Sequence, residues 1–187
     1  MKKLIKKISI LALIALPFVS CSSDDDSTTT QPVNNTIATL ASNNADLSIL
    51  VQALQKTDLV STLDGTQEFT VFAPTNASFT AFLQANGFAN LDAVPTNVLK
   101  EILLNHVVAG ELTASALNTG YVKTLAKGSA SPTNTLSLFV NTANGVVLNG
   151  GTSNNGGTVV TADVQASNGV VHVINGVLAL PTIVNHA

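Results

Sequence analysis

Three histidines are the residues of this 187-residue chain best suited to acid–base catalysis or metal binding. His106 follows Ile102 and Leu103 by four and three residues, so on a helix it projects from the apolar face. A catalytic or metal-binding role would need partner histidine, cysteine or carboxylate groups, and no adjacent motif offers them. We therefore expect His106 to be a buried neutral imidazole that bonds to backbone.

Neither of the other two histidines is assigned a catalytic or metal-binding role. His172 alternates with Val170 and Ile174, so all three share one face of an expected strand, and His172 is assigned the same structural role. His186 lies at the C-terminal end, where we expect solvent around it. A Ser-His-Asp site is spatial and the chain has many serines, but nothing resembles the GxSxG turn. The sequence predicts no enzyme, cofactor or metal; a hydrolase or lyase is the remote alternative.

Cys21 is the single cysteine, so an intramolecular disulfide is excluded. It follows a lysine-rich start, an apolar run over 8–16 and the small pair Val19-Ser20, which is the pattern of a secretory signal peptide over 1–20. The apolar run is shorter than the roughly 20 residues of a spanning helix.

The setting of Cys21 resembles a bacterial lipobox, with Phe18 where leucine is usual. We expect the signal peptide to be removed and Cys21 to carry the lipid that holds the chain on a bilayer. Ordinary cleavage that leaves a free thiol is the alternative.

The residues after Cys21 predict a disordered tether over 21–35, because they are polar and acidic and lack aromatic side chains. An acidic run in this tether resembles the signal that carries some lipoproteins of Gram-negative bacteria to the cell surface; a solvated linker is the alternative reading. Ser27 resembles a bacterial O-glycosylation acceptor. We expect an outer-membrane lipoprotein that faces outward. The run consists of Ser23, Asp24, Asp25 and Asp26.

The charge balance argues against nucleic acid as a partner. Four of the eight basic residues lie within the first seven positions, so the chain after residue 20 carries four lysines and eleven acids, a formal charge of −7. Nucleic-acid binding draws most of its affinity from lysine and arginine on phosphates. The same shortage, without a Walker-type or GxGxxG loop, argues against an enzyme that handles phosphates.

The elements that must position these residues fall into two halves. Helical spacing predicts a helix through 47–54, a second after Pro74 with Thr75 or Asn76 as its cap, and a third that begins at Thr96 as cap and ends at His106. Between the first two, Phe69 to Ala73 is a short strand-like run. The N-terminal half is therefore rich in helices.

From about residue 121 the chain changes to short apolar runs separated by Asn-Gly pairs, which favour tight hairpin turns. Helices first and hairpin strands afterwards predict an α+β domain with an antiparallel sheet system, not βαβ units. The range 141–157 is expected to be a long loop or an extended hairpin. Strands are expected at 136–140, 145–148, 158–164, 170–174 and 177–180.

Two segments resemble the signature motifs of fasciclin (FAS1) domains. The run FTVFAPTNASF over 69–79 resembles the first motif, and NGVVHVINGVL over 168–178 resembles the second. Between them, LLNHVV over 103–108 resembles the central Tyr-His segment. Order and spacing agree over 36–184. The residues that the motifs mark as structural are Phe72, Pro74, Thr75, Asn76, Phe79, His106, Asn168, Gly169 and His172.

The resemblance implies a wedge-shaped β-sandwich of about seven strands with helices packed along it, over 36–187. It also implies adhesion or extracellular binding without a cofactor. Asn105 stands where many members have tyrosine before the histidine. The integrin binding associated with that region in animal members is therefore not carried over.

The leading hypothesis is a non-enzymatic adhesion or interaction module at the cell surface, held in the bilayer by acylated Cys21. Its ligand is expected to be a surface protein or a polysaccharide. A protein is favoured, because polysaccharide platforms usually need exposed aromatic rings and the chain has one tyrosine and no tryptophan. The alternative is a structural envelope or matrix lipoprotein that faces the periplasm without a discrete ligand.

Overall fold

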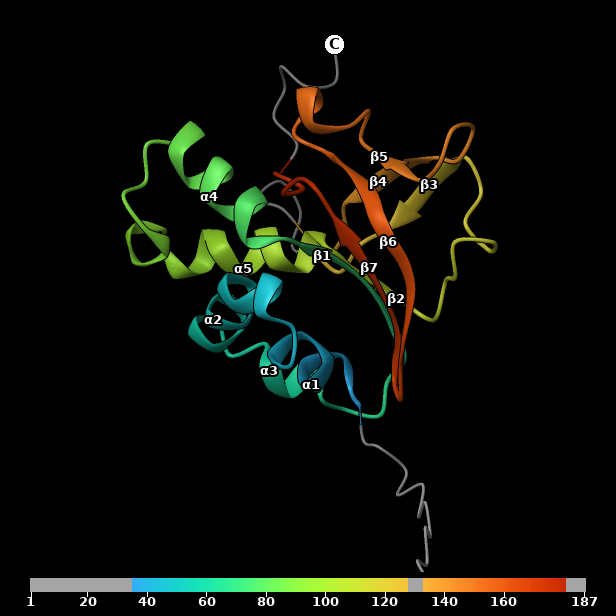
Figure 1. Cartoon of the computed structure of the whole chain (residues 1–187), viewed down its shortest axis with the longest axis horizontal. Coiled ribbons are helices and arrows are strands. Elements are labelled where there is room, and N and C mark those ends of the chain that lie inside the picture. Colours follow the sequence, from blue (N-terminus) through green and yellow to red (C-terminus); the bar gives the residue numbers. More distant parts are fainter. Residues whose placement is uncertain (1–34, 128–132, 181–187) are drawn as a thin grey trace, which may run out of the picture. The chain divides into compact units, whose positions relative to one another are not determined.

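The computed structural model describes residues 35–127 and 133–180 (Figure 1). The expectations for the signal peptide, the tether and the last residues lie outside these ranges. Within them, no helix combines the length and the apolar character that crossing a bilayer demands. The residues of these expectations that lie outside the described ranges are Cys21, Ser23, Asp24, Asp25, Asp26, Ser27 and His186.

The helices of the described chain precede most of the strands, as expected. Thr75 caps α4, because its side chain accepts a hydrogen bond from the Ser78 N–H. Thr96 does not cap α5: it is the first helical residue, and Pro95 occupies the cap position without a side-chain bond. The α-helices are α1 Ile37–Ser42, α2 Ser48–Lys56, α3 Val60–Leu63, α4 Asn76–Ala85 and α5 Thr96–Asn105; short 3-10 turns are η1 Ala45–Leu47, η2 Leu91–Ala93 and η3 Thr152–Asn154.

Seven strands form one hydrogen-bonded series in the order β2-β1-β7-β6-β5-β4-β3. The α+β class and the strand number agree with the prediction. The purely antiparallel sheet was wrong, because β1 pairs with β7 in parallel and the sheet is mixed. The strands are β1 Phe69–Pro74, β2 Val107–Ala109, β3 Gly120–Lys123, β4 Ser137–Asn141, β5 Val147–Leu148, β6 Gly157–Ala166 and β7 Gly169–Ile174.

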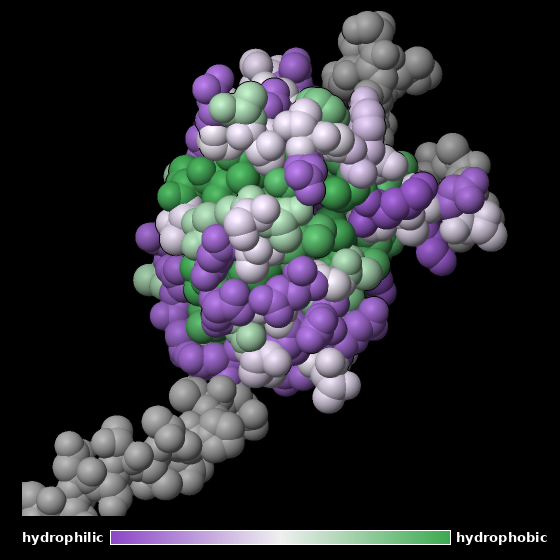
Figure 2. All heavy atoms as spheres, turned by 90° about the vertical axis from the view of Figure 1, so that its right-hand side faces the viewer, coloured by the Kyte–Doolittle hydropathy of each residue, from purple (hydrophilic) through white to green (hydrophobic). Residues whose placement is uncertain are grey.

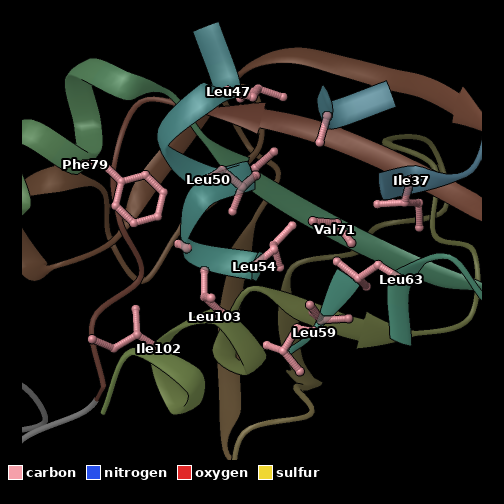
Figure 3. Packing of buried hydrophobic residues seen from close by; sticks show 14 of the residues in the cluster. Ile37, Leu47, Leu50, Leu54, Leu59, Leu63, Val71, Phe79, Ile102 and Leu103 are labelled. Atoms are coloured by element: carbon pink, nitrogen blue, oxygen red, sulfur yellow. The ribbon is translucent and has the colours of Figure 1, made fainter. Parts of the chain in front are cut away.

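Two hydrophobic cores hold the helices and the sheet together. In the larger one, Leu50 and Leu54 of α2 and Leu103 of α5 pack against Val71 of β1 and its neighbours (Figure 3). The smaller one lies between the two halves of the sheet, where Phe72 and Ile174 of β1 and β7 meet side chains of β4 and β5. The sheet therefore folds over on itself, which is the sandwich that the family resemblance implied.

The β6–β7 hairpin shows why one Asn-Gly pair is needed. Ala166 pairs with Gly169, so the two turn residues are Ser167 and Asn168, and neither has a positive φ. Gly169 begins β7 with a φ of +131°, and a Cβ at that position would overlap the carbonyl oxygen of Phe69. This glycine is required by the close approach of β1 and not by the turn itself.

Candidate functional site

His106 lies at the C-terminal cap of α5 and is 1% exposed. Its Nδ1–H donates to the carbonyl oxygen of Ile102 at 2.7 Å, and its Nε2 accepts from the N–H of Leu178 at 2.8 Å. Because Nε2 accepts, the proton is on Nδ1 and the ring is neutral. Burial lowers the pKa of His106 from its ordinary 6.5 to about 4, and the bond to Ile102 opposes that shift. Neither ring nitrogen is left for a substrate or a metal ion.

The segment after β7 is held by the end of α5. The predicted strand at 177–180 was wrong, because its backbone bonds to the side chains of Asn105 and His106 and to the carbonyl oxygen of Asn155, and not to a neighbouring strand. Besides the bond from Leu178 to His106, Nδ2 of Asn105 donates to the carbonyl oxygens of Leu178 and Ala179 at 3.2 and 3.3 Å. The Asn105 Oδ1 accepts from the Thr124 hydroxyl at 3.2 Å. Asn105 is therefore a buried linker of three segments.

His172 bonds a backbone N–H that a register shift in β6 leaves unpaired with β7. The register of β6 against β7 shifts between Thr161 and Val164, and Asp163 inside this shift has a φ of +58°. The Asp163 N–H donates to Nδ1 of His172 at 3.2 Å, while Nε2–H of His172 donates to the carbonyl oxygen of Leu112 at 2.9 Å. The fully buried ring also stacks on Phe72, with centroids 5.5 Å apart. As in His106, both nitrogens bond to backbone.

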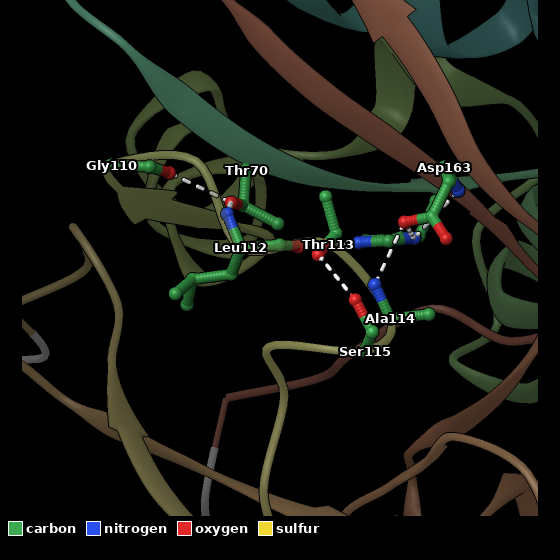
Figure 4. A network of polar contacts seen from close by, with 8 residues as sticks. Thr70, Gly110, Leu112, Thr113, Ala114, Ser115 and Asp163 are labelled. Atoms are coloured by element: carbon green, nitrogen blue, oxygen red, sulfur yellow. Dashed lines mark hydrogen bonds and ion pairs between the residues drawn. The ribbon is translucent and has the colours of Figure 1, made fainter.

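The same network fixes the segment that follows β2 (Figure 4). The Thr70 hydroxyl donates to the carbonyl oxygen of Gly110 at 2.7 Å and accepts from the Leu112 N–H at 2.8 Å. The Asp163 carboxylate accepts from the Ala114 N–H at 2.7 Å. Strands β1 and β6 thereby hold one loop from two sides, so these polar groups serve the fold.

Two amides of the signature motifs join elements that lie far apart in the sequence. Asn168, 4% exposed, accepts from the Ile37 N–H at 2.9 Å and donates to the carbonyl oxygens of Leu63 and Gly65 at 2.8 Å. It therefore ties the β6–β7 turn to the start of α1 and the end of α3. Asn76 accepts from the Ile49 N–H at 2.9 Å, which supplies α2 with the cap that its own Leu47 cannot provide.

Most phenylalanines of the described chain lie in the cores, but the tyrosine does not. Phe69, Phe72 and Phe79 are at most 2% exposed, as expected of core residues, and Phe82 is half-buried. Tyr121, the single tyrosine of the chain, is 73% exposed on β3.

Tyr121 lies on an outward face of the sheet. It pairs with Phe139 of β4, and the two rings have centroids 5.1 Å apart at an angle of 54°. Leu138, Val140 and Leu148 point into the smaller core, so the residues that alternate with them point outward. The register places seven side chains on this face, which we call the outer platform: Tyr121, Lys123, Ser137, Phe139, Asn141, Val147 and Thr158.

No described helix covers the outer platform, because α1 to α5 gather on the opposite side of the molecule (Figure 1). Figure 2 shows the side on which β3 and β6 lie, where a band of hydrophobic residues crosses the upper half and hydrophilic residues gather below. Lys123 is the single charged residue of β3, β4 and β5. The outer platform is thus aromatic, rich in amide and hydroxyl groups and free of acids.

One groove outside the outer platform is mainly apolar. This groove of about 340 Å³ between η1 and strands β6 and β7 is lined by Leu40, Leu47, Val164 and Val173 with asparagines at its rim, and no titratable side chain lines it. Among the described residues, no three His, Cys, Asp or Glu side chains gather closely enough to hold a metal ion.

The sequence does not single out the outer platform. Its signal is weak, because β3 has only four residues and its alternation of exposed and half-buried positions is too short to stand out. The motif residues that the sequence did single out are buried or bonded inside the fold.

Comparison with known proteins matches the fasciclin domain profile to residues 45–181. Protein sll1483 of Synechocystis is 41% identical over 148 residues, which cover 78% of this chain and 74% of that protein. The immunogenic protein MPB70 of Mycobacterium bovis is 35% identical, over 78% of this chain and 69% of its own length. The cell surface glycolipoprotein MPB83 of the same species is 42% identical over a shorter stretch, 44% of this chain and 38% of MPB83.

Among solved structures, a FAS1 domain pair from the insect cell adhesion molecule Fasciclin I superposes with a TM-score of 0.60. The match is 19% identical and covers 82% of this chain and 53% of that chain, so it bears on the fold alone. The profile match over most of the chain and the high identity to sll1483 agree with that fold. The chain belongs to the fasciclin family.

Proposed function

We propose that this chain is a non-enzymatic interaction module at the cell surface, tethered to the outer membrane by a lipid on Cys21. The observation that carries the proposal is the hydrogen bonding of its two buried histidines. His106 and His172 are buried and give both ring nitrogens to backbone groups, so neither can act as an acid, a base or a ligand. The outer platform, by contrast, is accessible and uncharged apart from one lysine.

The relatives support the same placement. One bears the name of a cell surface glycolipoprotein, and the fold neighbour is an insect cell adhesion molecule. Both descriptions belong to those proteins. Together with the lipobox-like setting of Cys21, they favour a tethered domain that meets surface proteins or polysaccharides outside the cell.

Attachment of living cells tests this function. A strain without the gene, complemented with the wild-type chain or with Cys21→Ser, is placed on the surfaces that the parent strain colonises. We expect the wild-type chain to restore attachment, and Cys21→Ser to fail because the domain is released. If deletion leaves attachment and cell aggregation unchanged, the proposed function is wrong.

Orientation is tested through the acidic run. We propose that Ser23 and the three aspartates direct the chain outward. Replacement of Asp24, Asp25 and Asp26 by alanine should then protect the domain from protease added to intact cells. Unchanged cleavage would reject the sorting role and leave a plain acidic linker. A wild-type chain that is itself protected would favour the structural alternative, an envelope component facing the periplasm.

A further inference from the structure

From the geometry of the outer platform we infer that this face binds a neutral polysaccharide, with one sugar ring stacked on Tyr121. The inference rests on the proposed function, since it names the ligand of the same surface module. It also reverses the preference for a protein partner that the count of aromatic residues suggested. The count did not reveal that the single tyrosine is exposed.

The first support is the position of the ring. Tyr121 is 73% exposed, yet Phe139 lies against it at a centroid distance of 5.1 Å. Phe139 is itself fixed by Asn149, whose Oδ1 accepts from the Phe139 N–H at 3.0 Å and whose N–H donates to the Phe139 carbonyl oxygen at 2.9 Å. A ring that is held in place before the ligand arrives loses little conformational entropy on binding.

The second support is the composition around the ring. Asn141 and Thr158 bring an amide and a hydroxyl to the face, and the Thr119 and Thr142 hydroxyls bond to each other at 3.0 Å beside it. Sugars present an apolar C–H face to aromatic rings and hydroxyl groups to such donors and acceptors. A face that combines an aromatic ring with amide and hydroxyl groups suits a ligand of this kind.

The third support is charge complementarity. All eight acids of the described chain lie outside β3, β4 and β5, and Lys123 is the one charge on these strands. A cationic partner finds no carboxylate here. A polyanion meets one lysine on a chain with a formal charge of −7 after residue 20, so repulsion opposes it. A neutral hydroxylated chain fits without electrostatic cost.

A protein ligand fits this face less well. Protein interfaces draw most of their energy from buried clusters of tryptophan, tyrosine, arginine and methionine. The chain has no tryptophan and no arginine, and its one methionine is the first residue. Tyr121 would be left as a single anchor on the outer platform, which suits stacking of a sugar better than the core of a protein interface.

Co-sedimentation tests the inference. The mature acylated chain, purified in a non-ionic detergent, is mixed with cellulose, chitin, insoluble xylan or curdlan, and with calcium alginate beads as the anionic comparison. We expect retention on at least one of the four neutral polymers. Tyr121→Ala should reduce it at least tenfold, and Tyr121→Phe should change it less than twofold because the ring remains.

Val98→Ala is the matched control, because Val98 is another exposed hydrophobic residue and lies on α5, away from the platform; it should leave retention unchanged. Equal melting temperatures of Tyr121→Ala and wild type exclude unfolding as the cause. Retention on none of the neutral polymers, on alginate alone, or equal retention of Tyr121→Ala overturns the inference. If Tyr121→Ala abolishes cell attachment while no neutral polymer binds, the partner is a protein: the inference then fails and the proposed function stands.

Discussion

At the scale of single residues, His106 and His172 each bond two backbone groups from different segments. In both cases one ring nitrogen donates to a carbonyl and the other accepts from an N–H. A neutral imidazole is well suited to this, because it offers one donor and one acceptor on a rigid ring. Protonation of His106 removes the acceptor, so its bond from the Leu178 N–H depends on the neutral form.

His106 should make stability depend on pH. Its pKa is about 4 in the folded chain and 6.5 in the ordinary state, so the unfolded chain binds the proton first as pH falls. The free energy of unfolding should therefore be unaffected above pH 6.5 and decline between about 6.5 and 4, with about 2 kcal/mol lost by pH 5. Urea unfolding at pH 7 and pH 5 measures this loss.

His106→Gln provides the control for that experiment, because glutamine does not titrate. The variant should be less stable at pH 7, by about 1–3 kcal/mol, since buried backbone groups lose partners. Its additional loss between pH 7 and 5 should be clearly smaller than that of the wild type. An identical pH dependence of the two chains would show that His106 is not the titrating group.

At the scale of elements, the amide of Asn168 joins the sheet to two helices. Asn168→Ala removes bonds to Ile37, Leu63 and Gly65, and leaves these backbone groups without their partner. We expect the free energy of unfolding to fall by about 2–4 kcal/mol. Amide hydrogen exchange at Ile37 should also become faster, because its N–H loses the bond to Asn168. Asn144→Ala, in the exposed β4–β5 loop, is the control and should change neither quantity.

Gly169 sets the approach of β7 to β1. In Gly169→Ala the new methyl group overlaps the Phe69 carbonyl oxygen and the residue keeps a φ of +131°, so we expect a loss of about 3 kcal/mol or more. Gly145 also has a positive φ, +85°, but nothing lies near its Cβ position. Gly145→Ala should therefore cost only about 1 kcal/mol. Similar melting temperatures of the two variants would contradict the close-approach argument.

The elements also show which parts of the fold the sequence predicts. Helices α2, α4 and α5 follow from local periodicity, as do β1 and β7. Helices α1 and α3 have six and four residues, too few for a periodic pattern to develop. The parallel pairing of β1 with β7 joins positions about a hundred residues apart, and no local signal encodes it. The run at 177–180 has the apolar composition of a strand, but its hydrogen-bond partners are the side chains of Asn105 and His106 and the carbonyl oxygen of Asn155, and local sequence does not encode these.

The sequence predicted part of the site region and missed the rest. The spacing around His106 and His172 predicted that both side chains are buried, and the structure confirms their burial. The outer platform could not be predicted, because it depends on which face of β3 and β4 the smaller core covers, and that follows from the folding over of the sheet. Exposure of Tyr121 is thus a tertiary property of a four-residue strand.

At the scale of the whole molecule, the proposed lipid and the outer platform act together. One isolated fasciclin domain with a single aromatic anchor is expected to bind weakly. Many copies held on one bilayer raise the effective concentration, and avidity can then exceed the affinity of each domain by orders of magnitude. Attachment should accordingly rise more steeply than in proportion to the number of chains per unit of membrane area.

Adhesion of vesicles tests the central claim most directly. Lipid vesicles that carry the mature acylated chain, and protein-free vesicles of the same composition, are added to cells of the deletion strain, and bound vesicles are counted. If the chain is a tethered interaction module, vesicles with the chain bind severalfold more than protein-free vesicles, and binding saturates. Equal binding of the two kinds of vesicle would contradict the account.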